Sequence, residues 1–364
     1  MKKRKAIVAC AVVLTLSASA ALIAQQEPLR KQDEPIKLRT NLVTVTAAVT
    51  DSRGRVIKSL READFIVYED GVKQRITHFG RTEEPFTVLL LLDVSGSTRD
   101  ELSLIKRAAK GFLGELRARD GVGLIVFSGG VEVIAEFTQD RARLEAAIDA
   151  VAAPAAGRFS STTGTAFYDA LDMAGKRIRG VEGRKAIVCM SDGVDSASRT
   201  ADSNAAREVE SSDASAYFLE LDTEETVLAG LLKPPTDPGY VNLSPRQIDR
   251  YYDQYDRESL DRYKHPRTIS PLVLREINTG LYEISMRELR QLAERSGGRV
   301  YPVSALTDLA AVYKQVADDL RSQYTLSYYP ANETPDGRWR KITVETRRRD
   351  AKVRARAGYW APSK

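Results

Sequence analysis

Residues 86–97 read Phe-Thr-Val-Leu-Leu-Leu-Leu-Asp-Val-Ser-Gly-Ser, an apolar run that ends in an acid and two hydroxyls. The run over 86–92 contains β-branched residues and no charge, as expected of a strand that is covered on both faces. Asp93, Ser95 and Ser97 follow directly, where a doubly wound sheet binds ligands beyond the carboxyl ends of its strands. The stretch therefore predicts a buried strand followed either by a simple polar turn or by a binding site.

Strands and helices alternate downstream of this stretch. Apolar residues recur with helical spacing in several windows, and short apolar runs separate them. We expect helices over 102–116, 144–151, 165–178 and 205–210, and strands over 122–127, 186–190 and 216–221. This alternation predicts a mostly parallel, doubly wound α/β sheet.

Two further segments place oxygen-bearing side chains at element boundaries. Thr165 opens a predicted helix, and Asp192 follows the predicted strand over 186–190. Each has a simple alternative, because threonine caps helices and Asp-Gly pairs form turns. Their joint occurrence with Asp93, at boundaries that face the same sheet edge, favours one shared site.

Asp93-x-Ser95-x-Ser97, Thr165 and Asp192 together resemble the metal-ion-dependent adhesion site of the von Willebrand factor A (VWA) family, over about residues 86–321. The resemblance implies that Ser95 and Ser97 ligate a cation directly and Thr165 directly or through water. It also implies that Asp93 and Asp192 hold coordinated waters. Hard oxygen ligands and retained waters suit Mg²⁺, with Mn²⁺ as a substitute, and a carboxylate of a partner protein would complete the shell.

Residues 223–280 interrupt the α/β rhythm with proline-rich and tyrosine-rich stretches. They form an insertion far longer than ordinary loops of such domains. Two interpretations stay open: a mobile partner-binding surface beside the site, or a partly disordered solvated excursion. The rhythm resumes with a helix starting at Ser285, a strand over 300–303 and a long helix over 307–321.

Both ends of the folded region have β patterning. Residues 38–84 contain about four short strands with an Asp70-Gly71 hairpin turn, and residues 322–364 contain three more segments. Neither segment has enough strands alone, so we expect the two to pair into one small β-sandwich, with the VWA domain (85–321) inserted between them. In Val353-Arg-Ala-Arg-Ala the alternation favours a solvated face for the arginines.

The N-terminus has the order of an export signal. Four cations, Lys2 to Lys5, precede nineteen uncharged residues, 6–24, with small residues suited to cleavage. We expect a signal peptide over 1–24, a flexible leader over 25–37, and a secreted or periplasmic envelope protein. An uncleaved membrane anchor and a lipoprotein cysteine at Cys10 are the alternatives, and contact with a membrane is expected only if the segment is retained.

Charge and cysteine content exclude other classes. Without the four signal-region cations, 51 basic residues face 50 acidic ones, which gives no support for nucleic-acid binding. Cys189 would be the only cysteine of the mature chain, so no disulfide within the chain is expected, and its apolar surroundings favour simple burial.

Enzymatic chemistry is poorly supported by the residues near the candidate site. A phosphatase of the haloacid dehalogenase type needs a second aspartate where Ser95 stands, and a serine nucleophile needs a base. The two histidines are His78, in the first β segment, and His265, in the insertion. We therefore expect a metal-dependent interaction module and no enzyme; a structural envelope module and a hydrolase stay as alternatives.

A narrower resemblance covers most of the chain. Asp64-Phe-x-Val-Tyr-Glu-Asp-Gly71, Gln323-Tyr-Thr-Leu-Ser-Tyr-Tyr-Pro330 and the closing Ala355-Arg-Ala-Gly-Tyr359 are similar to secreted VWA-related proteins of acidobacteria. This resemblance implies the architecture described above more than it implies a role.

Overall fold

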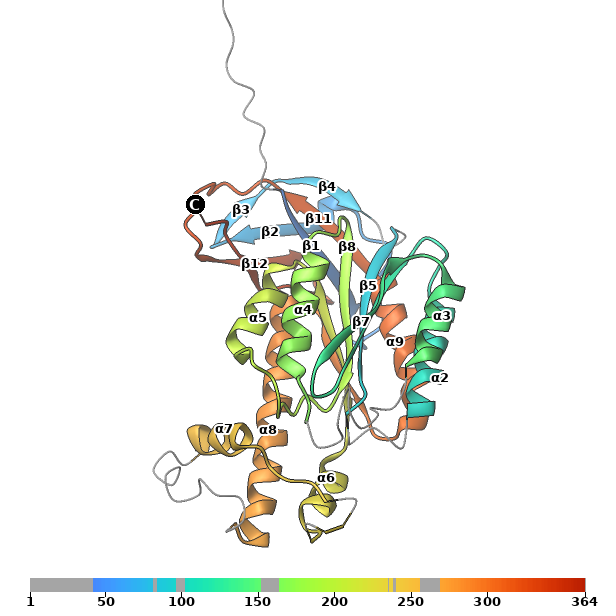
Figure 1. Ribbon diagram of the computed structural model, residues 1–364. Coiled ribbons are helices and arrows are strands. Elements are labelled where there is room, and N and C mark those ends of the chain that lie inside the picture. Colours follow the sequence, from blue (N-terminus) through green and yellow to red (C-terminus); the bar gives the residue numbers. More distant parts are fainter. Residues whose placement is uncertain are drawn as a thin grey trace, which may run out of the picture. The chain divides into compact units, whose positions relative to one another are not determined.

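The computed structural model describes residues 42–80, 84–95, 102–151, 164–234, 236–237, 240–255 and 269–363. Their strands form three sheets, one mixed and two antiparallel (Figure 1). The predicted signal peptide (1–24) and leader (25–37) lie outside the described residues.

The mixed sheet has six strands in the order β10-β9-β8-β5-β6-β7. They are β5 (Phe86–Asp93), β6 (Gly121–Phe127), β7 (Val131–Thr138), β8 (Arg184–Ser191), β9 (Ser215–Leu221) and β10 (Arg299–Val303). Neighbours are parallel except β6 and β7. The predicted α/β sheet is thus confirmed. The sequence pattern does not predict β7, whose residues are mostly half-buried on this edge of the sheet.

Helices cover both faces of this sheet (Figure 1). One face packs against α2 (Leu102–Glu115), α3 (Arg141–Ala150) and α9 (Leu309–Arg321), and the other against α4 (Phe167–Arg179), α5 (Asp202–Ser211) and α8 (Pro271–Ser296). Leu90 and Leu92 of β5 belong to the first core, and Leu89 and Leu91 to the second. Burial on both faces explains why the strand is a continuous apolar run rather than an alternating one.

The strand order reverses between β5 and β8. The chain passes from β5 to β6 on one side and later returns to β8 on the other side of β5. Both neighbours run parallel to β5, so the carboxyl ends of β5 and β8 lie side by side. This is the position at which doubly wound sheets bind ligands.

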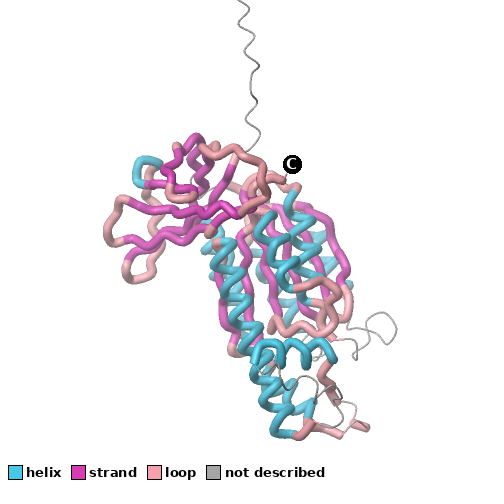
Figure 2. The backbone as a smooth tube through the Cα atoms, turned by 90° about the vertical axis from the view of Figure 1, so that its left-hand side faces the viewer, coloured by secondary structure: helices cyan, strands magenta, loops and turns pink. Residues whose placement is uncertain are grey.

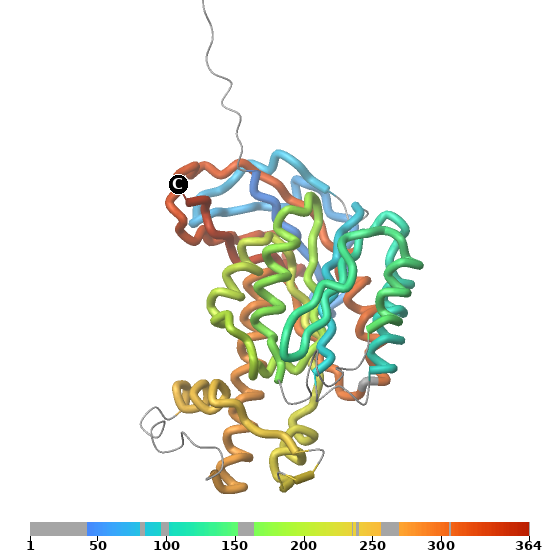
Figure 3. Tube along the Cα trace, viewed as in Figure 1, coloured from blue at the N-terminus to red at the C-terminus, as the bar shows by residue number. Residues whose placement is uncertain are grey.

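The two antiparallel sheets combine strands from both ends of the chain, in the orders β13-β1-β11-β4 and β14-β12-β2-β3. The strands are β1 (Val43–Asp51), β2 (Phe65–Glu69), β3 (Val72–Gln74), β4 (Ile76–Gly80), β11 (Gln323–Tyr328), β12 (Trp339–Thr346), β13 (Ala351–Ala355) and β14 (Gly358–Trp360). Figure 3 shows the N-terminal strands in blue beside the C-terminal strands in red. Val45, Val67 and Leu326 share one buried core between the sheets, which confirms the predicted sandwich.

The expected solvated face of the arginines at 354 and 356 is wrong. Arg354 forms an ion pair with Asp319 of α9 and donates to the Gly298 carbonyl oxygen at 3.0 Å. Arg356 is 6% exposed and pairs with Asp213, just before β9. An alternating pattern cannot distinguish a face in water from a face covered by another part of the chain with matching acids, and here α9 and the loop before β9 supply those acids.

The described residues of the insertion are mostly helical. The insertion contains α6 (Glu224–Leu231), α7 (Pro245–Tyr255) and the first part of α8. Its members share a small apolar core formed by Leu231, Leu243, Ile248, Tyr252, Ile269, Ile277 and Leu281. The tyrosine run therefore lies on a packed helix, since Tyr252 is 3% exposed.

The expected helix start at Ser285 is also wrong. The helix α8 begins at Pro271 and runs without a break from the insertion into the VWA domain (Figure 2). Ser270 caps it by accepting a hydrogen bond from the Val273 N–H at 3.3 Å. A serine followed by proline is the usual sequence signature of a helix start, and the proline-rich context conceals it here.

Cys189 lies in the middle of β8 and has no exposed surface. Two short 3-10 helices, η1 (Glu62–Asp64) and η5 (Leu306–Asp308), complete the elements of the described part. None of the helices in the described ranges combines the length and the apolar character needed to cross a membrane.

Candidate metal centre

The end of β5 is joined to the end of β8 through Asp93. Its Oδ1 accepts a hydrogen bond from the Ser95 N–H at 2.9 Å, and its Oδ2 accepts one from the Ser191 hydroxyl at 2.6 Å. Ser191 in turn accepts from the Gly193 N–H at 3.0 Å. Asp93, Ser95 and Ser191 are each at most 3% exposed. Ser191 is a site residue that the motif does not include, and its only sequence signal is its place before Asp192.

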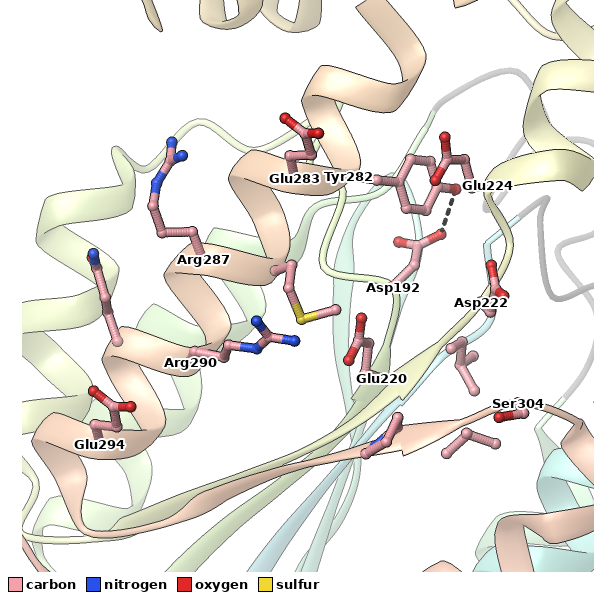
Figure 4. Close-up of a pocket in the computed structure, with 15 residues that line it drawn as sticks. Asp192, Glu220, Asp222, Glu224, Tyr282, Glu283, Arg287, Arg290, Glu294 and Ser304 are labelled. Carbon is pink, nitrogen blue, oxygen red and sulfur yellow. Dashed lines mark hydrogen bonds between the residues drawn. The ribbon is translucent and has the colours of Figure 1, made fainter.

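Asp192 is held by groups from three segments. Its Oδ1 accepts from the Val194 N–H at 3.0 Å, and its Oδ2 accepts from the hydroxyls of Thr223 and, at 3.3 Å, Tyr282 (Figure 4). Its backbone carbonyl accepts from the Ser285 hydroxyl at 2.8 Å. Thr223 precedes α6, and Tyr282 and Ser285 lie on α8. The insertion and its continuation therefore contact the candidate site directly.

Thr165 lies between the ends of β6 and β8. Its N–H donates to the Ser196 hydroxyl at 2.7 Å, and its carbonyl accepts from the N–H groups of Ser196 and Ala197 at 3.0 Å. The next N–H, of Ala166, donates to the Ser128 carbonyl at the end of β6. Thr165 thus lies at the same sheet edge as Asp93 and Asp192, and it is 8% exposed.

Four of the five predicted site residues are described, namely Asp93, Ser95, Thr165 and Asp192, and they lie at one edge of the sheet. Ser97 lies outside the described residues, as does His265. The convergence follows from topology, because β5 and β8 are parallel neighbours and α4 starts between the loops that follow β6 and β8.

A second pair of acids fixes the loop over 195–200 against the start of α4. Asp195 accepts from the Phe167 N–H at 3.1 Å and forms an ion pair with Arg246 of α7 at 2.9 Å. Asp169 accepts from the Thr200 N–H at 2.8 Å. Asp195 was not identified by sequence, where it is one more acid in a polar loop.

The electrostatics of the site favour a cation. Burial, and secondly the charge of Asp192, raise the pKa of Asp93 to about 7, although hydrogen bonds from Ser191 and Ser95 oppose the shift. Burial also raises the pKa of Asp192, while hydrogen bonds from Thr223, Val194 and Tyr282 lower it. Two buried carboxylates that repel each other are costly to ionise, and a nearby divalent cation would offset that cost.

The donor set fits a hard cation that keeps some of its waters. In the described part of the chain, no group of three or more acidic, histidine or cysteine side chains is placed to hold a metal by itself. The oxygen donors at this edge are the hydroxyls of Ser95 and Thr165 beside the carboxylates of Asp93 and Asp192. Such a mixture of hydroxyl and carboxylate oxygen fits Mg²⁺ better than zinc, which prefers nitrogen and sulfur.

A cleft of about 670 Å³ adjoins Asp192. It lies between α8 and the ends of β9 and β10, and Figure 4 shows its acidic and basic lining residues. Glu220, Asp222 and Glu224 lie on the strand side, whereas Arg287 and Arg290 project from α8. The cleft extends from Asp192 along α8 and the ends of β9 and β10.

Residues 88–194 match the family model of the von Willebrand factor type A domain. The fold around the candidate centre is therefore a VWA fold, with the two antiparallel sheets added by the terminal segments. No curated protein matches the sequence.

Solved structures similar to this chain include several VWA-type proteins. BatB from Bacteroides thetaiotaomicron is 18% identical, with a TM-score of 0.42 over 64% of this chain and 98% of that one. A von Willebrand factor type A protein from Catenulispora acidiphila is 12% identical, with a TM-score of 0.43 over 88% of this chain and 62% of that one. Proximal thread matrix protein 1 of the mussel byssus, described with zinc in its MIDAS motif, is 14% identical, with a TM-score of 0.39 over 65% and 48%.

Proposed function

We propose that this protein is an exported interaction module that binds Mg²⁺ at the edge formed by β5, β8 and the start of α4, and through it a carboxylate of a partner protein. One observation carries the proposal: Asp93, Ser95, Thr165 and Asp192 come from three separate segments and lie buried at the switch point of a VWA fold. The full motif adds Ser97, and the resemblance to secreted VWA-related acidobacterial proteins belongs to the same proposal.

Each residue has a role in this proposal. Ser95, Ser97 and Thr165 offer neutral hydroxyl oxygens, and Asp93 and Asp192 orient waters through their carboxylates. When bound, Mg²⁺ supplies an electrophilic position that accepts an anionic oxygen. Because few anionic side chains contact the ion directly, a partner carboxylate is attracted rather than excluded.

A binding role is favoured over catalysis. His78, the histidine within the described ranges, lies on β4 of the sandwich and contacts Glu84 at 3.7 Å. His78 therefore does not act as a base for a serine nucleophile at the β5–β8 edge. Export is proposed from the signal over 1–24, so the protein is expected in envelope or secreted fractions.

Metal binding and partner capture test the proposal together. We expect the purified protein to bind Mg²⁺ and Mn²⁺ by calorimetry, and Asp93→Ala to abolish binding while the variant still unfolds cooperatively in EDTA. Asp149→Ala is the matched control, because Asp149 is exposed and pairs only with Lys110 on the surface. Capture from envelope extracts should require Mg²⁺ and the wild-type Asp93.

Three results would contradict the proposal. If the wild type binds metal but EDTA and Asp93→Ala change no captured protein, the structural alternative stands. If the protein hydrolyses generic esters or phosphates and Ser95→Ala removes that activity, the enzyme alternative stands. Recovery from cytoplasmic fractions alone would exclude the proposed export.

A further inference from the structure

Two hydroxyls outside the five-residue motif hold the Asp192 carboxylate. The Thr223 hydroxyl donates to Oδ2 of Asp192. The Tyr282 hydroxyl lies 2.8 Å from the Thr223 hydroxyl oxygen and 3.3 Å from Oδ2, so its one proton is shared between these two acceptors. Thr223 is 9% exposed, and burial together with the charge of Asp192 raises the pKa of Tyr282 above its usual range. Both groups are therefore neutral donors at physiological pH.

These contacts use most of the hydrogen-bonding capacity of Asp192. A carboxylate has roughly four lone-pair positions. The Val194 N–H, the Thr223 hydroxyl and the Tyr282 hydroxyl fill three of them. These contacts fix the orientation of the carboxylate, which is the condition for holding a water of a bound cation in a fixed place.

The two donors connect Asp192 to the helical insertion. Thr223 lies at the start of α6 and Tyr282 on α8, whose next turn contributes Ser285 to the Asp192 carbonyl. Tyr282 and Ser285 are three residues apart and so lie on one face of the helix. A shift of α8 relative to β8 would break both contacts at once, whereas the Val194 N–H contact would persist because it lies within the β8 loop.

We propose that Thr223 and Tyr282 are positioning residues of the metal site, through which the helical insertion sets the affinity for the cation. This inference rests on the proposed function. Without either hydroxyl, the carboxylate of Asp192 can rotate in the metal-free protein. Binding of the cation must then order it, and this entropy cost weakens the affinity. Groups that orient metal-binding residues in this indirect way typically change metal affinity by about 10–100-fold.

The test measures Mn²⁺ affinity by electron paramagnetic resonance and Mg²⁺ affinity by calorimetry on the full chain. We expect Tyr282→Phe and Thr223→Val each to weaken both by about 10-fold or more. Thr223→Ser keeps the hydroxyl and should restore wild-type affinity. Tyr255→Phe is the matched control, because Tyr255 links α7 to Glu283 of α8 at 2.8 Å without touching Asp192.

The outcomes separate the two proposals. Wild-type affinity in both Tyr282→Phe and Thr223→Val overturns the positioning role, as does a Thr223→Ser variant as weak as Thr223→Val. An equal loss in Tyr255→Phe also overturns it, because general loosening of the insertion would then be the cause. If the wild type binds neither cation, the proposed function fails and this inference fails with it. Should Tyr282→Phe not fold, the valine and serine variants at position 223 decide alone.

Discussion

The two ends of the central sheet both bury charged groups, but they satisfy them in different ways. At the amino ends of the strands, where the sandwich packs, Arg354 meets Asp319 and Arg356 meets Asp213. At the carboxyl ends, Asp93 and Asp192 are held by hydroxyls and backbone N–H groups. The buried charges at the amino ends form ion pairs, whereas Asp93 and Asp192 at the carboxyl ends are held by neutral donors, with the ion pair of Asp195 and Arg246 beside them.

The comparison distinguishes charged groups that stabilise the contact with the sandwich from the two acids of the candidate metal centre. Opposite charges that meet at the sandwich contact offset part of each other's desolvation cost, and removing one of them leaves the other uncompensated. Burial and the neighbouring charge of Asp192 make Asp93 costly to ionise. The cation of the proposed function would offset this cost.

The largest expected effect lies at the sandwich end. Arg354→Met keeps the apolar stem but leaves Asp319, whose side chain is 12% exposed, with Tyr217 as its remaining side-chain donor. We expect a loss of about 3 kcal/mol in the free energy of unfolding by urea, since removing one partner of a buried pair strands the other charge. Mn²⁺ affinity should stay within about twofold. A loss below about 1 kcal/mol would show that this end is not stabilised by its pairs.

The next effect has the opposite sign and lies at the carboxyl end. In EDTA at pH 8, Asp93→Asn should raise the free energy of unfolding by roughly 2 kcal/mol, because the wild type buries a charge that asparagine lacks. The folded-state pKa of Asp93 is raised to about 7, so wild-type stability is highest in acid and falls as pH rises from about 4 through about 7. The gain should therefore vanish near pH 4, and a gain that is independent of pH would contradict this account.

The smallest expected effect on the free energy of unfolding concerns Arg246, which forms an ion pair with Asp195 at the carboxyl ends of the sheet strands. Arg246 pairs with the buried Asp195 and donates to the carbonyls of Ser198 and Thr200 at 2.7 and 2.9 Å. Its side chain is 34% exposed, and Asp195 keeps the Phe167 N–H, so Arg246→Met should cost only about 1 kcal/mol in urea unfolding. A cost equal to that of Arg354→Met would remove the contrast between the two ends.

The sequence predicted the parts of the fold that rest on one-dimensional patterns. The apolar run over 86–92 identifies β5 because burial on both faces leaves no room for polar residues. The pairing of the two β segments into a sandwich follows from edge strands that cannot stay unpaired. The positions of Asp93 and Asp192 follow from where their strands end.

What the sequence did not reveal depends on contacts between distant segments. Nothing local marks Thr223 or Tyr282 as neighbours of Asp192, because they are 31 and 90 residues away in sequence. Arg354 and Arg356 look solvated until Asp319 of α9 and Asp213 of the loop before β9 are placed opposite them. The insertion looked irregular because the start of α8, marked by Ser270 and Pro271, stands among turn-forming residues.

The reactivity of the Cys189 thiol reports on the opening of β8. The thiol lies in β8, three residues before Asp192, with no surface open to solvent, and burial raises its pKa well above the usual range. Alkylating reagents react with the thiolate, so the buried thiol of Cys189 does not react until β8 separates from its neighbours. The rate at which the Cys189 thiol is modified therefore measures how often β8 separates from its neighbouring strands, and no label has to be introduced.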